Sequence, residues 1–258
     1  MEFGDRSAAS RRVAPSQAGR MPTSAHGSPR GAVRQRPRSD KLKFFAVIVA
    51  SALLSAVWAG CADRAAPLVA FLGDSLTDGW GVHRGSAYPA LVGMALAQRG
   101  RSIRVLNAGR GGDTVAQGRG RLREVLAKRP EVVVIALGVN DILRGFSVEQ
   151  ADYDLRAMVV EARTHGAKVI LVGVRAPSPE AAELSRRFAS MFRSLAAELD
   201  VPLVPDLLAG TSADADRMYW DGLHPSVLGH RQLAENVLPA LERVLDELAA
   251  GRRPLARP

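Results

Sequence analysis

Cysteine and aromatic residues are scarce in this sequence, and metal-binding patterns are absent from it. Only one of the 258 residues is a cysteine, Cys61, so no disulfide can form within the chain. No C-x-x-C, H-E-x-x-H or clustered His/Cys pattern occurs, and these are the usual sequence patterns of zinc sites. We therefore expect no metal and no cofactor, so that any chemistry must come from ordinary side chains.

A basic surface is also missing from most of the chain, although its formal net charge is +9. Residues 1–60 hold 10 of the 35 Lys and Arg but only three of the 26 Asp and Glu, which leaves 25 basic and 23 acidic side chains for the rest. That remainder has no basic stripe and no interleaved aromatic residues. The composition argues against a nucleic-acid partner.

The first 61 residues have the composition of a leader. Residues 1–40 are rich in Arg, Pro, Ser, Gly and Ala with little apolar periodicity, which predicts a disordered basic segment. Residues 41–61 predict a signal peptide, because Lys41 and Lys43 precede an apolar run over 44–59. As a helix, these 16 residues would reach about 24 Å, which is short of the roughly 30 Å of a bilayer core.

The end of this apolar run predicts how the leader is processed. The sequence Trp-Ala-Gly-Cys at 58–61 resembles a bacterial lipoprotein cleavage site, in which Cys61 becomes the lipidated first residue, although tryptophan departs from the small aliphatic residue usual there. The alternatives are ordinary signal cleavage near Ala59 or Ala62 and an uncleaved anchor at 44–59. All three export the rest of the chain. We expect an exported protein, either periplasmic or attached to a membrane as a lipoprotein.

From Leu68 onward, short apolar runs alternate with helical periodicity, a pattern typical of βα units around a parallel sheet. The run 132–137 is apolar throughout, as expected of a strand buried on both faces. We expect one domain over 62–250, built as a three-layer α/β/α sandwich with a central, mostly parallel five-stranded sheet, and a flexible tail at 251–258. The candidate strands are Leu68–Leu72, Ile103–Asn107, Val132–Leu137, Lys168–Val174 and Pro202–Val204.

Three helices are predicted by their apolar stripes. One spans 148–165 and begins with a capping box that Ser147 opens. A second follows the Ser-Pro pair at 178–179, a favourable cap and first-turn combination. The third spans roughly 227–249, and Pro239 predicts that it kinks or restarts.

The first candidate strand runs directly into Gly73-Asp74-Ser75-Leu76, which places Ser75 on the turn at the strand's carboxyl end. Active sites of doubly wound sheets lie at this edge. The turn would expose the serine hydroxyl, but an ordinary Asp-Ser turn or helix cap has the same sequence. Ser75 is therefore a candidate nucleophile whose assignment depends on the other motifs.

Two further loops offer hydrogen-bond donors at the same edge. The glycines of the loop 107–114 let a substrate approach backbone N–H groups, although an ordinary flexible loop with Asp113 as a helix cap would look the same. After the third strand, Asn140 offers a neutral amide that can donate to developing negative charge. A turn asparagine bonded to its own backbone is the alternative.

Near the C-terminus, Asp221 and His224 form an Asp-x-x-His pattern. In a tight turn this spacing lets the carboxylate reach one imidazole nitrogen, which leaves the other free to take a proton from a serine. His83, His165 and His230 have no carboxylate at this spacing, so we expect surface or structural roles for them.

A serine, a glycine loop, an asparagine and an Asp-x-x-His at four successive loops resemble the SGNH (GDSL) hydrolase family. The sequences at 107–114, 138–141 and 143–146 are similar to its bacterial exported acyl-CoA thioesterase/lysophospholipase/arylesterase branch, and the resemblance covers about 68–248. Val139 departs from that branch, where a second glycine is common. The resemblance implies the flavodoxin-like SGNH hydrolase fold.

The resemblance also implies the role of each site residue. Ser75 would be the nucleophile, His224 the general base and acid, and Asp221 the residue that orients His224. The Ser75 N–H, the Gly112 N–H and the Asn140 side chain would form the oxyanion hole, with no metal. The implied activity is that of a serine esterase or thioesterase acting on short to medium acyl esters, lysophospholipids or acyl thioesters.

The substrate is a small-molecule or lipid acyl ester on this interpretation, and Phe146 and Trp220 would line its pocket or simply pack. Two other functions stay open: a carbohydrate O-acetyl esterase acting on envelope polysaccharide, and a lipoprotein that binds ligands without turnover. The complete set of motifs argues against the second. The absence of G-x-S-x-G argues against an α/β-hydrolase.

Overall fold

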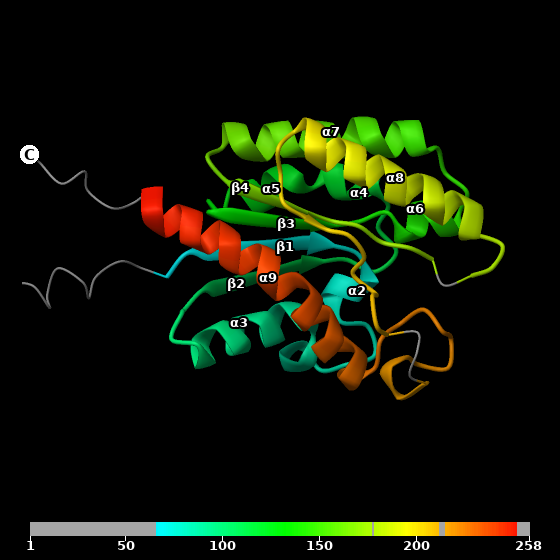
Figure 1. Cartoon of the computed structure of the whole chain (residues 1–258), viewed down its shortest axis with the longest axis horizontal. Coiled ribbons are helices and arrows are strands. Elements are labelled where there is room, and N and C mark those ends of the chain that lie inside the picture. Colours follow the sequence, from blue (N-terminus) through cyan, green and yellow to red (C-terminus); the bar gives the residue numbers. More distant parts are fainter. Residues whose placement is uncertain (1–65, 177, 212–214, 252–258) are drawn as a thin grey trace, which may run out of the picture. The chain divides into compact units, whose positions relative to one another are not determined.

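The computed structural model describes residues 66–176, 178–211 and 215–251 (Figure 1). The predicted leader at 1–40, the signal peptide at 41–61 with Cys61, and the tail from 252 lie outside the described residues. None of the helices in the described part of the chain is long and apolar enough to cross a bilayer.

Five parallel strands form one sheet in the order β2-β1-β3-β4-β5, which confirms the predicted five-stranded sheet and makes it fully parallel. The strands are β1 Leu68–Gly73, β2 Arg104–Gly109, β3 Val132–Ala136, β4 Lys168–Val172 and β5 Leu203–Val204. Every residue of β3 is buried, as its apolar sequence predicts.

The predicted end of the second strand is two residues too early. Asn107, Ala108 and Gly109 continue the ladder by pairing with Phe71, Leu72 and Gly73 of β1. Pairing with β1 thus keeps these three residues in the strand, although Asn, Ala and Gly have low strand propensity. As a result, β1 and β2 both run up to the loops that hold the candidate site.

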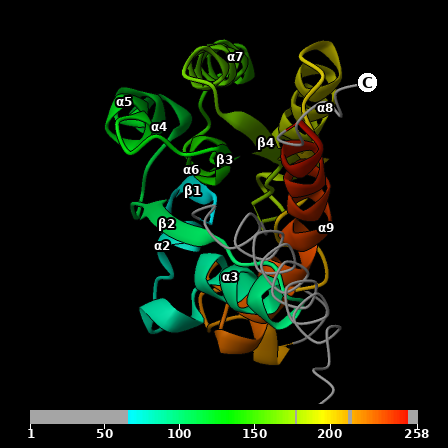
Figure 2. The same ribbon diagram turned by 90° about the vertical axis from the view of Figure 1, so that its left-hand side faces the viewer.

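Helices cover both faces of the sheet. Figure 2 shows α3 and α9 on one face and α4, α5 and α7 on the other, while α8 packs against α7, β4 and β5. This arrangement confirms the predicted three-layer sandwich. The helices are α2 Ser75–Asp78, α3 Tyr88–Gln98, α4 Val115–Gly120, α5 Leu122–Leu126, α6 Val139–Leu143, α7 Val148–Thr164, α8 Ala182–Glu198 and α9 Val227–Gly251, with short 3-10 helices η1 Arg84–Ser86 and η2 Ala215–Arg217.

The predicted start of one helix is wrong, and of the two outcomes predicted at Pro239, a kink or a restart, the restart does not occur. α8 begins at Ala182 rather than after Ser178, because the backbone at 178–182 first forms a turn and Ala181 caps the helix without a side-chain bond. α9 runs from Val227 to Gly251 as one helix with Pro239 inside it, so it does not restart there.

The strand order places the topological switch point of the sheet between β1 and β3. The chain leaves β1 toward β2 on one side, and leaves β3 toward β4 on the other. In doubly wound sheets, ligands bind at the carboxyl ends of the strands where the chain direction reverses in this way. The Ser75 turn follows β1 and the Asn140 loop follows β3, so both candidate motifs border this point.

Candidate active site

The serine motif forms a tight turn at the carboxyl end of β1. Asp74 is the N-cap of α2, and its Oδ1 accepts a hydrogen bond from the Leu76 N–H at 3.0 Å. Gly73 has no room for a side chain, since a Cβ there would lie 2.0 Å from Thr77 Oγ1. The turn therefore fixes Ser75 as the first residue of α2, with 7% of the residue exposed.

A second loop carries the Asp-x-x-His motif and is closed by an antiparallel bridge between Met218 and Pro225. Asp221 Oδ1 accepts hydrogen bonds from the N–H groups of Leu223 and His224, both at 3.0 Å. Burial opposes ionisation, but these N–H groups and the His224 ring hold the pKa of Asp221 below its usual value. The ionised carboxylate is thereby held toward His224.

The two loops meet through their side chains. Asp221 Oδ2 lies 2.6 Å from His224 Nδ1, and His224 Nε2 lies 3.0 Å from Ser75 Oγ. An ionised carboxylate can only accept hydrogen bonds, so the ring proton belongs on Nδ1 and Nε2 can accept from the serine hydroxyl. The structure thus brings the three predicted side chains into one hydrogen-bonded chain, although Ser75 and His224 are 149 positions apart in the sequence.

The glycine loop lies against the serine. A Cβ on Gly111 would lie 3.9 Å from Ser75 Cβ, and Gly112 has a φ of +80°, a conformation that favours glycine. Asn140, in the first turn of α6, donates from Nδ2 to the Asp113 carbonyl at 3.0 Å. A side-chain amide has two N–H donors, so a second one stays available. Asp113 thus links Gly112, its neighbour in the chain, to Asn140.

Sequence reasoning missed the buried arginine that holds these loops. Arg121 donates from Nε to Asp113 Oδ2 (2.5 Å), from Nη1 to the Ala108 carbonyl (2.6 Å) and from Nη2 to the Gly73 carbonyl (2.7 Å). Thr114 rather than Asp113 caps α4, so the Asp113 carboxylate serves this ion pair. The one available signal was a basic residue directly before α5, and nothing in the local sequence points to Gly73, its partner 48 positions earlier.

Two more carboxyl groups lie beneath the loops. Asp74 is fully buried, and burial, together with the charges of Asp113 and Asp141, raises its pKa to about 7 against the opposing Leu76 hydrogen bond. Within the described residues its Oδ2 has no hydrogen-bond partner. Asp141 Oδ2 accepts from the Val115 N–H at 3.0 Å, and burial raises its pKa. Asp141 therefore joins α6 to the start of α4.

Three aromatic side chains near these loops are exposed. The two expected pocket residues, Phe146 and Trp220, are 47% and 92% exposed. Trp80 was not predicted from the sequence, and its ring centroid lies 4.2 Å from that of His224. Its position five residues after Ser75 was the available signal.

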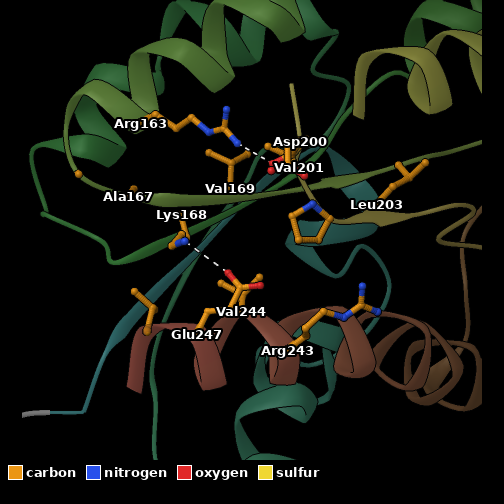
Figure 3. Close-up of a pocket in the computed structure, with 13 residues that line it drawn as sticks. Arg163, Ala167, Lys168, Val169, Asp200, Val201, Leu203, Arg243, Val244 and Glu247 are labelled. Atoms are coloured by element: carbon orange, nitrogen blue, oxygen red, sulfur yellow. Dashed lines mark hydrogen bonds and ion pairs between the residues drawn. The ribbon is translucent and has the colours of Figure 1, made fainter. Parts of the chain in front are cut away.

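A different hollow lies at the opposite, amino-terminal edge of the sheet. This groove has a volume of about 680 Å³. Figure 3 shows it beside the first residues of β4 and β5. Lys168 Nζ lies 3.3 Å from Glu247 Oε2, and Arg163 Nη2 donates to the Asp200 carbonyl at 2.7 Å. None of the predicted site residues lines it. In the described part of the chain, no group of three or more His, Cys, Asp or Glu could hold a metal ion.

Comparison with known proteins agrees with this geometry. Over 184 residues, the chain is 37% identical to the esterase TesA of Pseudomonas aeruginosa, which covers 71% of this chain and 92% of that protein. It is 33% identical over 163 residues to thioesterase 1/protease 1/lysophospholipase L1 of Escherichia coli K12, with 63% of this chain and 77% of the relative covered. A crystal structure of TesA superposes with a TM-score of 0.66 at 36% identity, over 69% of this chain and 99% of that one.

The sequence model of the GDSL-like lipase/acylhydrolase family matches residues 71–232, a segment that runs from β1 into α9 and includes every predicted catalytic residue. The relatives named above are an esterase and a thioesterase/lysophospholipase, which is the activity that the motifs imply. This chain therefore belongs to the GDSL-like lipase/acylhydrolase family, the SGNH hydrolases, and is an ester-hydrolysing enzyme.

Proposed function

We propose that this enzyme hydrolyses acyl esters and thioesters through an acyl-enzyme on Ser75, with His224 as general base and acid and Asp221 as the residue that orients His224. The observation that carries the proposal is the hydrogen-bonded chain from Asp221 Oδ2 through the His224 ring to Ser75 Oγ. The 3.0 Å between His224 Nε2 and Ser75 Oγ suits proton transfer from the serine, and the 2.6 Å between Asp221 Oδ2 and His224 Nδ1 suits the bond that orients the ring. No metal takes part in the proposed reaction.

In the acylation step, Ser75 Oγ attacks the acyl carbonyl while His224 Nε2 takes the hydroxyl proton. The carbonyl oxygen becomes an oxyanion, which the Ser75 N–H, the Gly112 N–H and the Asn140 amide would stabilise. When the intermediate collapses, the bond to the leaving group breaks, and the His224 proton passes to the departing alcohol or thiol. The negative charge of Asp221 favours the imidazolium that forms in between.

Deacylation repeats these steps with water as the nucleophile. His224 takes a proton from water, the hydroxide attacks the acyl-enzyme, and the same three donors would hold the second oxyanion. Ser75 Oγ leaves as the alcohol after it regains the proton from His224. The products are a carboxylic acid and the free serine, so no co-reactant other than water is required.

The proposed substrates are short to medium acyl esters, lysophospholipids and acyl thioesters. Relatives named esterase and thioesterase/lysophospholipase support this range. Phe146 and Trp220 offer exposed apolar surface that we assign to contact with the acyl chain. The buried ion pair of Arg121 with Asp113 would keep the oxyanion donors fixed while different substrates bind.

The test is turnover by the enzyme and by Ser75→Ala, without added metal, on p-nitrophenyl esters of increasing acyl length. Palmitoyl-CoA, a lysophospholipid and acetylated xylan complete the series. Loss of the nucleophile in a serine hydrolase lowers kcat by roughly 10⁶-fold, so we expect almost no activity in Ser75→Ala. Ser102→Ala, on the exposed surface before β2, is the matched control and keeps wild-type turnover.

The acyl length with the highest kcat/KM decides the substrate class. A maximum at butyryl or longer chains, or on the lysophospholipid or thioester, supports the proposal. A strong preference for acetyl groups on xylan would replace it with the carbohydrate esterase. Equal turnover by wild type and Ser75→Ala would contradict the serine mechanism itself.

We also propose that the enzyme is exported and held at a membrane by lipid on Cys61. The support is the basic and apolar segment at 41–61, which ends in the cleavage-site resemblance. Metabolic labelling with a radioactive fatty acid in a bacterial host tests the lipid. Label in the wild type and none in Cys61→Ser is the expected result, whereas an unlabelled wild-type protein in the periplasmic fraction would indicate ordinary signal cleavage.

A further inference from the structure

Trp80 lies where the serine loop meets the histidine loop. It follows Gly79, the C-cap of α2, and its backbone N–H donates to the Ser75 carbonyl at 3.1 Å. Its ring stacks on the His224 ring with the centroids 4.2 Å apart and the planes inclined by 32°. The backbone of Trp80 is thus fixed to the nucleophile and its side chain to the general base.

Tyr219 ties the same two loops together from the other side. Its ring meets Trp80 edge-on, with centroids 6.0 Å apart, and its hydroxyl donates to the Gly81 carbonyl at 2.6 Å. Its backbone N–H donates to the His224 carbonyl at 2.8 Å. Gly81 has a φ of +80°, and a Cβ there would lie 2.6 Å from the Tyr219 ring, so the close approach requires glycine. Trp80 is therefore held firmly against His224.

The face of an indole ring attracts cations, and among the aromatic side chains tryptophan does so most strongly. His224 becomes a cation each time it takes the proton from Ser75 or from water. Asp221 bonds its Nδ1 and Ser75 its Nε2, so the Trp80 face adds a third contact perpendicular to both. From α9, burial lowers the pKa of His230 to about 4, so that ring stays neutral and does not repel the cation.

We propose that Trp80 is a positioning residue that keeps the His224 ring aligned between Ser75 and Asp221 and stabilises its imidazolium form. The inference rests on the proposed roles of Ser75 and His224. Because the imidazolium is present at the transition state and absent in the bound ground state, this contact raises kcat rather than substrate affinity. A contact of Trp80 with the substrate would act mainly on KM instead.

Two substitutions distinguish the effect of the stacked aromatic ring from that of side-chain volume. Trp80→Leu keeps an apolar side chain without a ring, whereas Trp80→Phe keeps an aromatic ring. On p-nitrophenyl butyrate we expect Trp80→Leu to lower kcat roughly 10-fold with KM within about twofold of wild type. The acidic midpoint of its kcat/KM profile should move about half a pH unit lower, since the imidazolium loses a favourable contact. Trp80→Phe keeps a weaker aromatic face, so its kcat should stay within about threefold, with a smaller shift in the same direction.

Melting temperatures of all variants show whether folding is affected, and Tyr153→Leu is the matched control. Tyr153 is an exposed aromatic on α7 whose ring lies under the Arg119 guanidinium at 5.2 Å, so its removal takes away a similar contact far along the chain from the site. That variant should keep wild-type kcat and pH profile. Should Trp80→Leu not fold, the graded effect of Trp80→Phe alone carries the test.

Two results would overturn the inference. A rise in KM at unchanged kcat would make Trp80 a substrate contact, and a loss of kcat that Phe does not rescue, with no change in the pH profile, would make it purely structural. Failure of the proposed function looks different, because turnover would then persist in Ser75→Ala whatever residue stands at position 80.

Discussion

At the amino-terminal edge of the sheet, two ion pairs have partly exposed side chains. Lys168 and Glu247 are both about half exposed, and Arg101 and Asp246 are 31% and 71% exposed. At the carboxyl edge, the side chains of Arg121 and Asp113 are only 9% and 6% exposed. These two pairs at the amino-terminal edge thus stay in water, whereas the Arg121–Asp113 pair at the carboxyl edge is removed from it.

This difference indicates which edge performs chemistry. An exposed pair contributes about 0–1 kcal/mol, because water screens it and both side chains lose freedom. A buried pair must recover a desolvation penalty, so it persists only where several well-oriented hydrogen bonds hold it. Buried polar networks of this kind fix a site in one geometry, and the Arg121 network does this beneath Ser75, whereas the volume of the groove in Figure 3 carries no such information.

The largest expected effect is on the general base. We expect His224→Ala to lower kcat by roughly 10⁵- to 10⁶-fold and Asp221→Ala by about 10⁴-fold, since the base and its orienting partner act as a unit with the nucleophile. His165→Ala is the matched control, because His165 caps α7 and bonds the Glu161 carbonyl away from the serine. Steady-state kinetics with the same ester measures all three. A loss of kcat in His165→Ala as large as that in His224→Ala would contradict the assignment of catalysis to the carboxyl edge.

The second effect concerns stability. Arg121→Met leaves the Asp113 carboxylate buried without its cation and removes the donors to two strand-end carbonyls, so we expect a loss of about 3–5 kcal/mol in the free energy of unfolding. Arg101→Met breaks an exposed pair with Asp246 and should lose no more than about 1 kcal/mol. Urea denaturation measures both, and equal losses would show that burial does not distinguish the two pairs.

The third effect concerns the oxyanion hole. Loss of one donor typically lowers kcat 10²- to 10³-fold, or about 3–4 kcal/mol, and we expect this of Asn140→Ala. Because the same amide also bonds the Asp113 carbonyl, the control is Asn236→Ala, which removes an amide that bonds the Leu207 and Ala209 carbonyls. The control should lose stability while keeping kcat. Wild-type turnover in Asn140→Ala would remove this residue from the proposed hole.

The fourth effect is on the pH dependence of stability. The pKa of Asp74 is about 7 in the folded protein against 3.8 for an ordinary aspartate, so the folded state holds the extra proton between these values. Its contribution to stability is full below pH 4 and is lost as the pH rises through 7, by about 2 kcal/mol between pH 5 and 7. Asp74→Asn has no carboxyl group to titrate at this position. The free energy of unfolding of wild type, relative to that of the variant, should therefore decline from pH 5 to pH 7.

The comparison with Asp74→Asn is needed because His230 contributes a pH dependence of stability with the opposite sign. Burial lowers its pKa from 6.5 to about 4, so its contribution is present above pH 6.5 and is lost as the pH falls toward 4. The wild-type curve alone therefore mixes two opposing slopes. Urea denaturation of wild type and Asp74→Asn at pH 5, 6 and 7 isolates the Asp74 contribution, and parallel curves would contradict its raised pKa.

The smallest effect is expected in the groove. Glu247→Gln breaks the exposed pair with Lys168 and should change the free energy of unfolding by less than about 1 kcal/mol, with kcat and KM unchanged. The measurement combines urea denaturation with the standard ester assay. A large loss of turnover in Glu247→Gln would show that the amino-terminal edge contributes to catalysis, contrary to our expectation.

The elements with strong local patterns could be predicted from the sequence. β3 is apolar throughout, and α7 shows a regular stripe after Ser147, so both were predicted within one residue of their ends. α8 was misplaced at its start because the Ser178 hydroxyl bonds the Glu180 carboxylate instead of capping a helix, and the backbone at 178–182 forms a turn. Local signals determine an element most reliably where no tertiary contact competes with them.

The same division applies to the site. Asp221 and His224 are three residues apart, so their contact could be inferred from a single turn. The contacts of Arg121 with Gly73 and Ala108, and the stack of Trp80 on His224, join segments that only the sheet order brings together. The spacing of residues in the sequence does not reveal such partners, so the roles of Arg121 and Trp80 were not predicted.

Covalent labelling by a fluorophosphonate, read by intact-protein and peptide mass spectrometry, tests directly whether Ser75 is the nucleophile. We expect one adduct per chain, located on Ser75, none in Ser75→Ala and much slower labelling in His224→Ala. An adduct on another residue, or full ester turnover by protein that the reagent leaves unlabelled, would contradict a Ser75 acyl-enzyme.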